Sequence, residues 1–292
     1  MKFKVAIIGT GNIGTDLLMK LLKIEDIEVV AFVGRRDPSK PIPEGVLYSK
    51  DGIEFFIKNP NCCHLVFDCT DAYTAISHSQ IFSKQGIIVI DLTPSQVGKM
   101  FVPYVNCQKL INETNINMVT CGGQVSIPIL YYISKKTKVE YAEVVTQISA
   151  NSAGMATREN IDKYIETTEN AIKQLTNVKN CKVILTLNPS EMASMQTSIY
   201  MKATRADFED FDEFTEKIKE YVPNYKISLR PTYLSNGICM VSMNIIGSGD
   251  FLSKYAGNLD VINCAAIYAV KLFKQNYRYS RPLLGNALGV WT

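Results

Sequence analysis

One cysteine of this 292-residue chain stands in a context that suits nucleophilic chemistry. Cys121 follows the short β-prone run NMVT and precedes Gly122 and Gly123, and apolar residues then continue at helical spacing over 124–134. A thiol at the start of a helix lies near free backbone N–H groups and the positive end of the helix dipole, and both favour the thiolate. We predict that Cys121 attacks a carbonyl carbon and that the backbone N–H groups of these three residues stabilise the oxyanion.

A second chemical signal lies at the beginning of the chain, where a glycine-rich loop joins a predicted strand to a predicted helix. The loop reads Gly9-Thr10-Gly11-Asn12-Ile13-Gly14. In such loops the first glycine permits a tight turn, the second lets the backbone approach a pyrophosphate, and the third lets helix and strand pack closely. The phosphates lie at the helix N-terminus. We predict a dinucleotide site whose nicotinamide takes hydride from an adduct on Cys121, leaving an enzyme thioester.

The residues after the second predicted strand, 27–33, bear on which dinucleotide binds. An acidic side chain at this point holds the ribose of NAD, whereas an arginine accommodates the 2′-phosphate of NADP. The sequence carries both kinds, as Arg35, Arg36 and Asp37. Two adjacent arginines favour a phosphate, so we expect NADP to be accepted without excluding NAD.

The composition argues against several other kinds of active site. Only two histidines, His64 and His78, accompany eight cysteines, so a His-rich metal site or a Ser-His-Asp hydrolase is disfavoured and we expect no metal. With 31 basic and 28 acidic residues, the net charge of +3 is too small to indicate nucleic acid as a partner. Hydrophobic residues make up 47% of the chain, which is typical of a globular protein.

The cysteines and the apolar segments indicate a cytoplasmic protein. The eight cysteines show no paired spacing, and most of them lie in apolar runs where a free thiol packs as a small hydrophobe. The sequence shows neither a secretory signal nor a stretch of about 20 apolar residues. We therefore expect reduced thiols, a reducing cytoplasm and no association with membranes.

The two halves of the chain predict different sheets. Predicted strands at 4–8, 27–33, 64–68 and 87–91 alternate with predicted helices, which indicates a parallel sheet covered on both faces. In the second half, predicted strands at 141–149, 182–187, 198–203 and 238–246 are separated by fewer helices, at 158–175 and 211–221. This pattern favours a mixed or antiparallel sheet, followed by a closing helix over 259–273.

Several segments together resemble the acylating acetaldehyde dehydrogenase family. They are DLTP (91–94), NMVTCGGQ (117–124), YAEVV (141–145), SAGMATRENID (152–162) and YAGNLD (255–260), in the order in which the family carries them. The resemblance implies interconversion of a short aldehyde, acetaldehyde first, coenzyme A and NAD(P) with acyl-CoA and NAD(P)H, through a thioester on Cys121. In the second half it implies dinucleotide contacts from Ser152, Ala153, Gly154, Thr157, Arg158, Asn160 and Asn258.

The resemblance also implies an architecture like that of glyceraldehyde-3-phosphate dehydrogenase. A Rossmann dinucleotide-binding domain would comprise residues 1–121 and 258–292, and a mixed α/β domain for catalysis and dimerisation would comprise 122–257. Members of the family form homodimers and often pair with a 4-hydroxy-2-oxovalerate aldolase that hands over acetaldehyde. The terminal segment 277–292 shows no clear helical period after Pro282, and we expect it to be extended or to contact a partner.

Three departures from the family pattern bear on activity. Thr197 stands opposite an aspartate that is thought to help deprotonate the nucleophile, so the helix dipole alone, Glu191 in its place, or reduced activity remain as alternatives. Gly154-Met155-Ala156 replaces a Gly-Pro-Gly turn, and the stretch between residues 37 and 60 looks shortened. A related semialdehyde or acyl-phosphate reductase, with Arg158 and Arg205 as an anion clamp, and a weakly active partner subunit of an aldolase are the competing interpretations.

Overall fold

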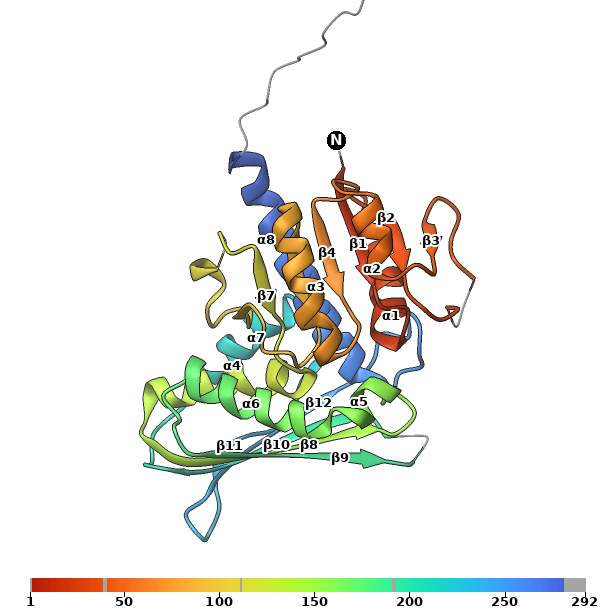
Figure 1. Ribbon diagram of the computed structural model, residues 1–292. Helices are drawn as coiled ribbons and strands as arrows, with labels where there is room; N and C mark the ends of the chain where they lie inside the picture. The colour runs from red at the N-terminus through yellow and green to blue at the C-terminus, as the bar shows by residue number, and fades with distance from the viewer. Residues whose placement is uncertain (1, 39–40, 111, 191–192, 281–292) are drawn as a thin grey trace, which may run out of the picture.

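The computed structural model describes residues 2–38, 41–110, 112–190 and 193–280, which form two β-sheets with helices packed on them (Figure 1). The first sheet has the strand order β3-β2-β1-β4-β5-β7-β6, and every pairing in it is parallel. Its strands are β1 (Phe3–Ile8), β2 (Ile27–Val33), β3 (Leu47–Ser49), β4 (Leu65–Asp68), β5 (Ile88–Asp91), β6 (Lys99–Met100) and β7 (Asn115–Asn117).

Helices cover both faces of the first sheet because alternate residues of its strands are apolar on both sides. Val5 and Ile7 of β1 belong to the core shared with α1 (Asn12–Leu21). Ala6 and Ile8 point the other way and pack with phenylalanines of α2 (Ile53–Lys58) and α3 (Ala72–Gln85). This two-sided burial is the arrangement expected of a parallel sheet. A short 3-10 helix, Cys107–Lys109, lies between β6 and β7.

The second sheet is mixed, with the strand order β11-β12-β10-β8-β9. The pair β8–β9 is parallel and the other pairs are antiparallel. Its strands are β8 (Val139–Ser149), β9 (Cys181–Asn188), β10 (Met195–Ala203), β11 (Tyr225–Tyr233) and β12 (Cys239–Ile245). The accompanying helices are α4 (Cys121–Lys136), α5 (Met155–Glu159), α6 (Ile161–Leu175) and α7 (Phe211–Lys219).

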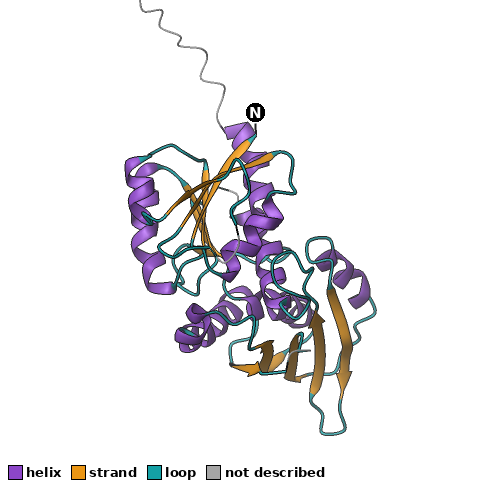
Figure 2. Ribbon diagram, turned by 90° about the vertical axis from the view of Figure 1, so that its right-hand side faces the viewer, coloured by secondary structure: helices purple, strands orange, loops and turns teal. Residues whose placement is uncertain are grey.

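In the described part of the chain, helices cover only one face of the second sheet (Figures 1 and 2). Helix α4 packs against β8 and β10, and α6 packs against β9. The inner positions of β10 are buried, while the alternate positions are half-buried or exposed. The outer face is therefore a sheet surface that the described residues leave open to solvent.

The last helix, α8 (Gly257–Ser280), connects the two halves of the molecule. It packs against α1, α4, β5 and β12, and it runs along the first sheet in Figure 1. Near its start, the amide of Asn263 donates a hydrogen bond to Asp16 of α1 over 2.8 Å. The carboxylate of Asp260 pairs with the buried ammonium group of Lys20. These buried contacts join α8 to α1.

The structure confirms both predicted sheet types and most of the predicted elements. The strand 27–33 has the predicted bounds, whereas the predicted helix 158–175 is divided at Asn160 into α5 and α6. The short elements β3 and α2 and the strand β11 were not predicted. Helix α8 continues to Ser280, which corrects the expectation of an extended segment from 277, and residues 281–292 lie outside the described residues. No helix of the described chain is long and apolar enough to span a membrane.

Candidate functional site

A strained turn between β7 and α4 places Cys121 at the first position of the helix. Val119 has a φ angle of +62°, which a β-branched residue rarely adopts. Its N–H group donates to the side-chain oxygen of Asn117 over 2.9 Å, and this bond holds the turn. Thr120 is the N-cap, and its hydroxyl oxygen accepts from the N–H group of Gly123 at 2.9 Å. The thiol is therefore presented by a fixed backbone.

The sulfur of Cys121 lies against the hydroxyl group of Tyr164, which comes from α6. The distance from Sγ to the tyrosine oxygen is 3.8 Å, and the N–H group of Gly122 donates to the same oxygen over 3.0 Å. A Cβ atom at Gly122 would lie 2.0 Å from that oxygen. Glycine is thus required here because the tyrosine approaches the backbone so closely.

These contacts correct the prediction that the N–H groups of residues 121–123 bind an oxyanion. The N–H of Gly122 is bonded to Tyr164, and the N–H of Gly123 is bonded to its N-cap, Thr120. The N–H groups that we expected to bind the substrate oxyanion already have hydrogen-bond partners within the protein. Two of the three predicted donors are therefore already engaged.

The protonation of Cys121 also differs from the expectation for a helix terminus. Burial raises the pKa of its thiol to about 11, although the hydrogen bonds from Tyr164 and the Gly122 N–H group act to lower it. Burial and the neighbouring Cys121 sulfur raise the pKa of Tyr164 well above its usual value. At neutral pH the thiol is therefore protonated, and the tyrosine is a hydrogen-bond donor rather than a base.

Cys121 opens into a cavity of about 70 Å³ between the two halves of the molecule. The first half contributes the ends of β4 and β5 and the glycine loop, and the second half contributes α5, α6 and the start of α8. Thr157, Asn160 and Asn258, which the family resemblance assigns to the dinucleotide, lie in this wall together with Ile13. The remaining lining residues are Cys69, Thr70, Asp71, Leu92, Thr93, Pro94, Val119, Thr120, Tyr164 and Ile262.

The glycine loop has the geometry that a dinucleotide requires. Gly9 has a φ angle of +109°, and a Cβ atom there would meet the backbone of Cys69 at 2.5 Å. A Cβ atom at Gly14 would lie 1.9 Å from the carbonyl oxygen of Gly9, so this glycine permits the strand and helix to pack. At Gly11, by contrast, a Cβ atom would meet nothing within 4 Å. Gly11 is exposed at the N-cap of α1 and leaves space for phosphate.

The segment 152–160 lies beside this loop, as the family resemblance implies. Gly154 is close to Asn12, because a Cβ atom at Gly154 would lie 3.8 Å from the Asn12 amide nitrogen. Ser152 and Ala153 are buried. Arg158 donates to the carbonyl oxygens of Ala150 at 2.8 Å and Ala153 at 3.2 Å. Its guanidinium group therefore holds the loop in shape.

The three charged residues after β2, Arg35, Arg36 and Asp37, make different contacts. Arg35 lines a second hollow together with Gly9 and Gly34, and Thr70 lines both this hollow and the cavity. The carboxylate of Asp37 pairs with Lys50 at 2.6 Å. The carbonyl oxygen of Arg36 accepts from Thr10 at 3.0 Å and from Tyr48 at 2.9 Å, so the loop is anchored through its backbone.

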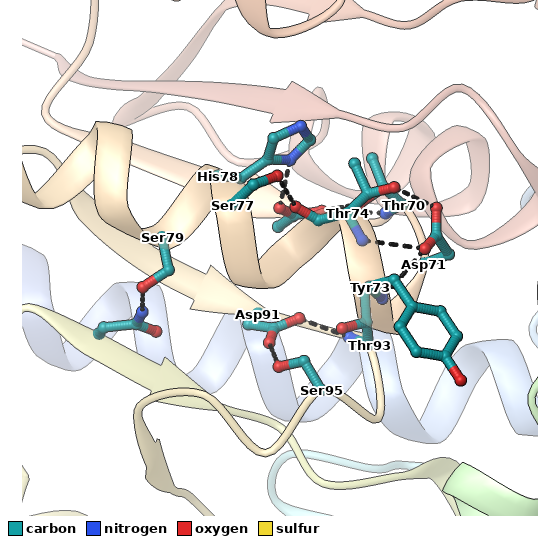
Figure 3. A network of polar contacts seen from close by, with 12 residues as sticks. Thr70, Asp71, Tyr73, Thr74, Ser77, His78, Ser79, Asp91, Thr93 and Ser95 are labelled. Atoms are coloured by element: carbon teal, nitrogen blue, oxygen red, sulfur yellow. Dashed lines mark hydrogen bonds and ion pairs between the residues drawn. The ribbon is translucent and has the colours of Figure 1, made fainter.

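A buried polar network supports the carboxyl edge of the first sheet (Figure 3). Asp68 and Asp91 end neighbouring strands and lie side by side in register. Asp91 accepts from the N–H group of Thr93 and from Ser95, and His78 lies 2.8 Å from Asp68. His78 is buried and its contact with Asp68 helps to hold this edge of the sheet. Asn117 connects this network to the turn before Cys121, since its amide donates to Asp91 over 2.9 Å.

Unpartnered polar atoms in the cavity fit a nicotinamide dinucleotide. The side-chain oxygens of Asn258 and Thr93 are buried and have no hydrogen-bond partner among the described residues. A buried polar atom without a partner is costly, so such atoms mark places where a ligand bonds. With the open space at Gly11, they give contacts for both the carboxamide end and the phosphate end of the cofactor.

Comparison with known proteins identifies the family. Residues 4–111 match the description "Semialdehyde dehydrogenase, NAD binding domain", and residues 121–253 match "Prokaryotic acetaldehyde dehydrogenase, dimerisation". An acetaldehyde dehydrogenase of Spirochaeta aurantia is 45% identical over 90% of this chain and 92% of its own length. The chain belongs to the acetaldehyde dehydrogenase family. Another family member, from Pectobacterium atrosepticum, is 42% identical over 96% of this chain and 98% of its own length.

Solved structures of more distant proteins share the fold. Aspartate semialdehyde dehydrogenase II from Vibrio cholerae matches with a TM-score of 0.68 at 15% identity, covering 95% of this chain and 100% of its own. A probable aspartate-semialdehyde dehydrogenase from Pseudomonas aeruginosa matches with a TM-score of 0.69 at 12% identity, with the same coverage. The family assignment makes this chain an NAD(P)-dependent oxidoreductase of the aldehyde dehydrogenase class with a dimerisation domain.

Two residues near Cys121 were not predicted from the sequence. Tyr164 and Thr146 belong to no motif, and only the packing of α6 and β8 brings them to the nucleophile. Thr197, singled out as a departure from the family pattern, is buried on β10 with its hydroxyl oxygen 3.1 Å from that of Thr146. Glu191, the alternative base, lies outside the described residues.

Proposed function

We propose that this protein is a coenzyme A-acylating aldehyde dehydrogenase whose nucleophile is Cys121. The observation that supports it most is that Cys121 and Asn258 line one cavity that adjoins the glycine loop. The reacting sulfur and a contact for the nicotinamide end are therefore close together. We further propose Gly9–Gly14, Arg35 and the segment 152–160 as the dinucleotide-binding parts, with residues 1–121 and 258–292 as one domain and 122–257 as the other.

In this mechanism the thiolate of Cys121 adds to the carbonyl carbon of the aldehyde and forms a thiohemiacetal. Bound NAD(P) supplies the hydride acceptor that the oxidation requires. The strained turn at Val119 and the cap at Thr120 hold the sulfur in place, while Asn258 in the cavity wall would hold the nicotinamide end. Loss of the hydride and of the hydroxyl proton leaves an acyl thioester on Cys121. Exchange with a coenzyme A thiolate then releases acyl-CoA and regenerates the Cys121 thiolate.

Coenzyme A is favoured over water as the acyl acceptor by the residues around the sulfur. Water needs a general base to attack a thioester, whereas a thiol does so as its thiolate. Among the described residues that line the cavity, Asp71 is the only carboxylate and none is a histidine. The carboxylate of Asp71 caps α3 by accepting from the N–H groups of Tyr73 and Thr74 at 3.0 Å each. The cavity therefore offers no free base for hydrolysis from the described residues.

The lining of the cavity supports an uncharged aldehyde, with acetaldehyde as the first substrate to test. Ile13, Leu92 and Ile262 make part of its wall apolar, and Asp71 is the only charged side chain among the described lining residues. The competing semialdehyde or acyl-phosphate reductase is less well supported. Arg158 is bonded to loop carbonyls, and the Arg205 guanidinium lies 5.4 Å from the centre of the Tyr233 ring. The two arginines therefore do not form an anion clamp at the sulfur.

The proposal includes the assembly and compartment that the family resemblance implies. The outer face of the second sheet, within the segment that matches the dimerisation description, is the surface we assign to a homodimer. A 4-hydroxy-2-oxovalerate-type aldolase is the proposed supplier of acetaldehyde, and co-purification of the two chains tests it. All eight cysteines are free thiols, which fits a reducing cytoplasm.

The proposed function is tested by trapping the acyl enzyme. Purified protein is incubated with acetyl-CoA in the absence of a reduced dinucleotide and digested under acid conditions that preserve thioesters. We expect one acetyl group on the peptide that contains Cys121 and none on that peptide in Cys121→Ala. An acetyl group confined to other cysteines, or none at all with the dinucleotide site intact, would reject the proposal.

A further inference from the structure

Three hydroxyl groups form a buried chain that ends at the sulfur of Cys121. Tyr164 contacts the sulfur, Thr146 bonds to the tyrosine oxygen, and Thr197 lies 3.1 Å from the Thr146 oxygen. The two threonines are 0% exposed and the tyrosine is 6% exposed. They come from β8, α6 and β10, so the fold rather than local sequence brings them into line.

The partners of the tyrosine oxygen determine where its proton points. The N–H group of Gly122 donates to this oxygen over 3.0 Å, and the hydroxyl group of Thr146 makes a side-chain hydrogen bond with it. A hydroxyl oxygen accepts two hydrogen bonds and donates one, so when Thr146 is the donor of its bond, the Tyr164 proton is directed to Sγ, 3.8 Å away. Thr146 in turn is satisfied when Thr197 donates to it. All three hydroxyl groups then donate along one direction, toward the sulfur.

We propose that Tyr164 stabilises the Cys121 thiolate by donating a hydrogen bond to it, and that Thr146 and Thr197 are positioning residues that polarise this donor. The inference rests on the proposed role of Cys121 as the nucleophile. A chain of hydroxyl donors polarises each member, so the last bond is stronger than an isolated one. The chain therefore does for the thiolate what a neighbouring cation does in other thiol enzymes.

The same hydrogen bond serves both ends of the reaction. Before attack, Tyr164 stabilises the thiolate once the thiol proton has left to solvent. When coenzyme A takes the acyl group, the C–S bond breaks and the sulfur leaves with the electron pair, again as a thiolate that accepts from Tyr164. The tyrosine keeps its proton throughout, because burial and the neighbouring sulfur raise its pKa.

Other titratable groups at the cavity are placed differently. Cys69 is buried, and its pKa is raised by burial and by the charges of Asp68 and Asp91, so it stays a neutral thiol. Asp71 has its carboxylate turned to the N-terminus of α3. Among the described residues, Tyr164 is therefore the side chain with a polar hydrogen in contact with Sγ.

The test measures the rate of Cys121 alkylation by iodoacetamide between pH 7 and 10, quantified on the Cys121 peptide by mass spectrometry. The alkylation midpoint is calculated from the thiolate fraction that these rates give, because the thiol pKa of about 11 lies above this range. Tyr164→Phe keeps the ring and removes the donor, so the alkylation midpoint should move to higher pH by about one unit. At pH 8 this corresponds to about tenfold slower alkylation. Tyr132→Phe is the matched control, because Tyr132 is also 6% exposed but its hydroxyl bonds to Asp210. It should leave the midpoint unchanged.

The role of the two threonines is tested by substituting them both in the wild type and in Tyr164→Phe. Thr197→Val and Thr146→Val should each shift the midpoint in the same direction by less than Tyr164→Phe does, and the shift should vanish when Tyr164 is already Phe. An unshifted midpoint in a folded Tyr164→Phe protein that still binds the dinucleotide would overturn the proposal. So would a threonine shift that persists at full size in the Tyr164→Phe background. Either result leaves the acyl-enzyme test of Cys121 unaffected.

Discussion

The carboxylate of Asp37 lies 2.6 Å from the ammonium group of Lys50, on the outside of the loop that follows β2. An acidic residue that selects NAD must direct its carboxylate to the ribose hydroxyl groups. Asp37 is instead paired with a lysine, while Arg35 lines the hollow beside the glycine loop. This arrangement favours acceptance of a 2′-phosphate.

We therefore expect the enzyme to use NADP at least as well as NAD. Arg35→Ala should raise KM for NADP by about tenfold, the size of a lost charge-assisted hydrogen bond, and change KM for NAD much less. Steady-state rates with both cofactors measure this. Equal effects on the two cofactors would show that Arg35 does not contact a 2′-phosphate.

Substitutions at two glycines of the loop should have different effects, one on dinucleotide binding and the other on folding. A Cβ atom at Gly11 meets nothing in the protein, so Gly11→Ala should change Tm by no more than about 3 °C and still weaken dinucleotide binding by about tenfold or more. In Gly14→Ala the new atom would lie 1.9 Å from the Gly9 carbonyl oxygen, so the strand and helix must separate. That variant should lose stability outright. Thermal melts and dinucleotide titrations distinguish the two.

Asn258 and Asn263 are close in sequence on α8 and should respond oppositely to the same substitution. Asn258 has a buried oxygen with no partner among the described residues, so Asn258→Leu should preserve or raise the free energy of unfolding and lower kcat/KM. The oxygen of Asn263 is likewise without a partner among the described residues, but its amide donates to Asp16 over 2.8 Å, so Asn263→Leu should destabilise the protein by about 1–3 kcal/mol. Urea denaturation with activity assays measures both. An Asn258→Leu enzyme of normal activity would contradict the assignment of Asn258 to the cofactor.

Two aspartates at the edge of the first sheet should give opposite pH dependence of stability. Burial and the charge of Asp68 raise the pKa of Asp91 in the native state. A raised native pKa stabilises the fold at pH values below the unfolded-state pKa of about 4, and this contribution is lost as pH rises through the native pKa. The stability of the wild type relative to Asp91→Asn should therefore fall as pH rises from 4 to 8.

Asp71 is the matched control for this measurement. Burial acts to raise its pKa, but hydrogen bonds from Thr74 and from the N–H group of Tyr73 lower it overall. Its contribution is present above the unfolded-state pKa and is lost as pH falls through the native pKa. The stability of the wild type relative to Asp71→Asn should rise with pH over the acidic range. The same sign of slope for both aspartates would refute this account of the network.

Local sequence patterns were sufficient to predict many of the strands and helices. The strand at Ile27–Val33 and the glycine loop were predicted because apolar period and turn chemistry are local properties. Strand β11 was missed because its exposed positions alternate with half-buried ones and give little apolar signal. The break at Asn160 was missed for a similar reason, since the helical period continues across it.

Only those residues of the candidate site that lie in a recognisable sequence motif could be predicted. Cys121 stands next to two glycines in a recognisable segment, whereas Tyr164 and Thr146 reach the sulfur from elements that are far away in the sequence. The engagement of the Gly122 and Gly123 N–H groups was equally hidden, because it depends on a cap and on a side chain from another helix. Tertiary contacts of this kind produce no periodic pattern in the sequence, so they could not be predicted from it.

The most direct test of the account is the coenzyme A-dependent reduction of NAD or NADP by acetaldehyde, compared between the wild type and Cys121→Ala. The wild type should produce reduced dinucleotide only when coenzyme A is present. Cys121→Ala should produce none, while it binds the dinucleotide with unchanged affinity. Turnover by Cys121→Ala at a rate near that of the wild type would contradict the central claim that this sulfur carries the acyl group.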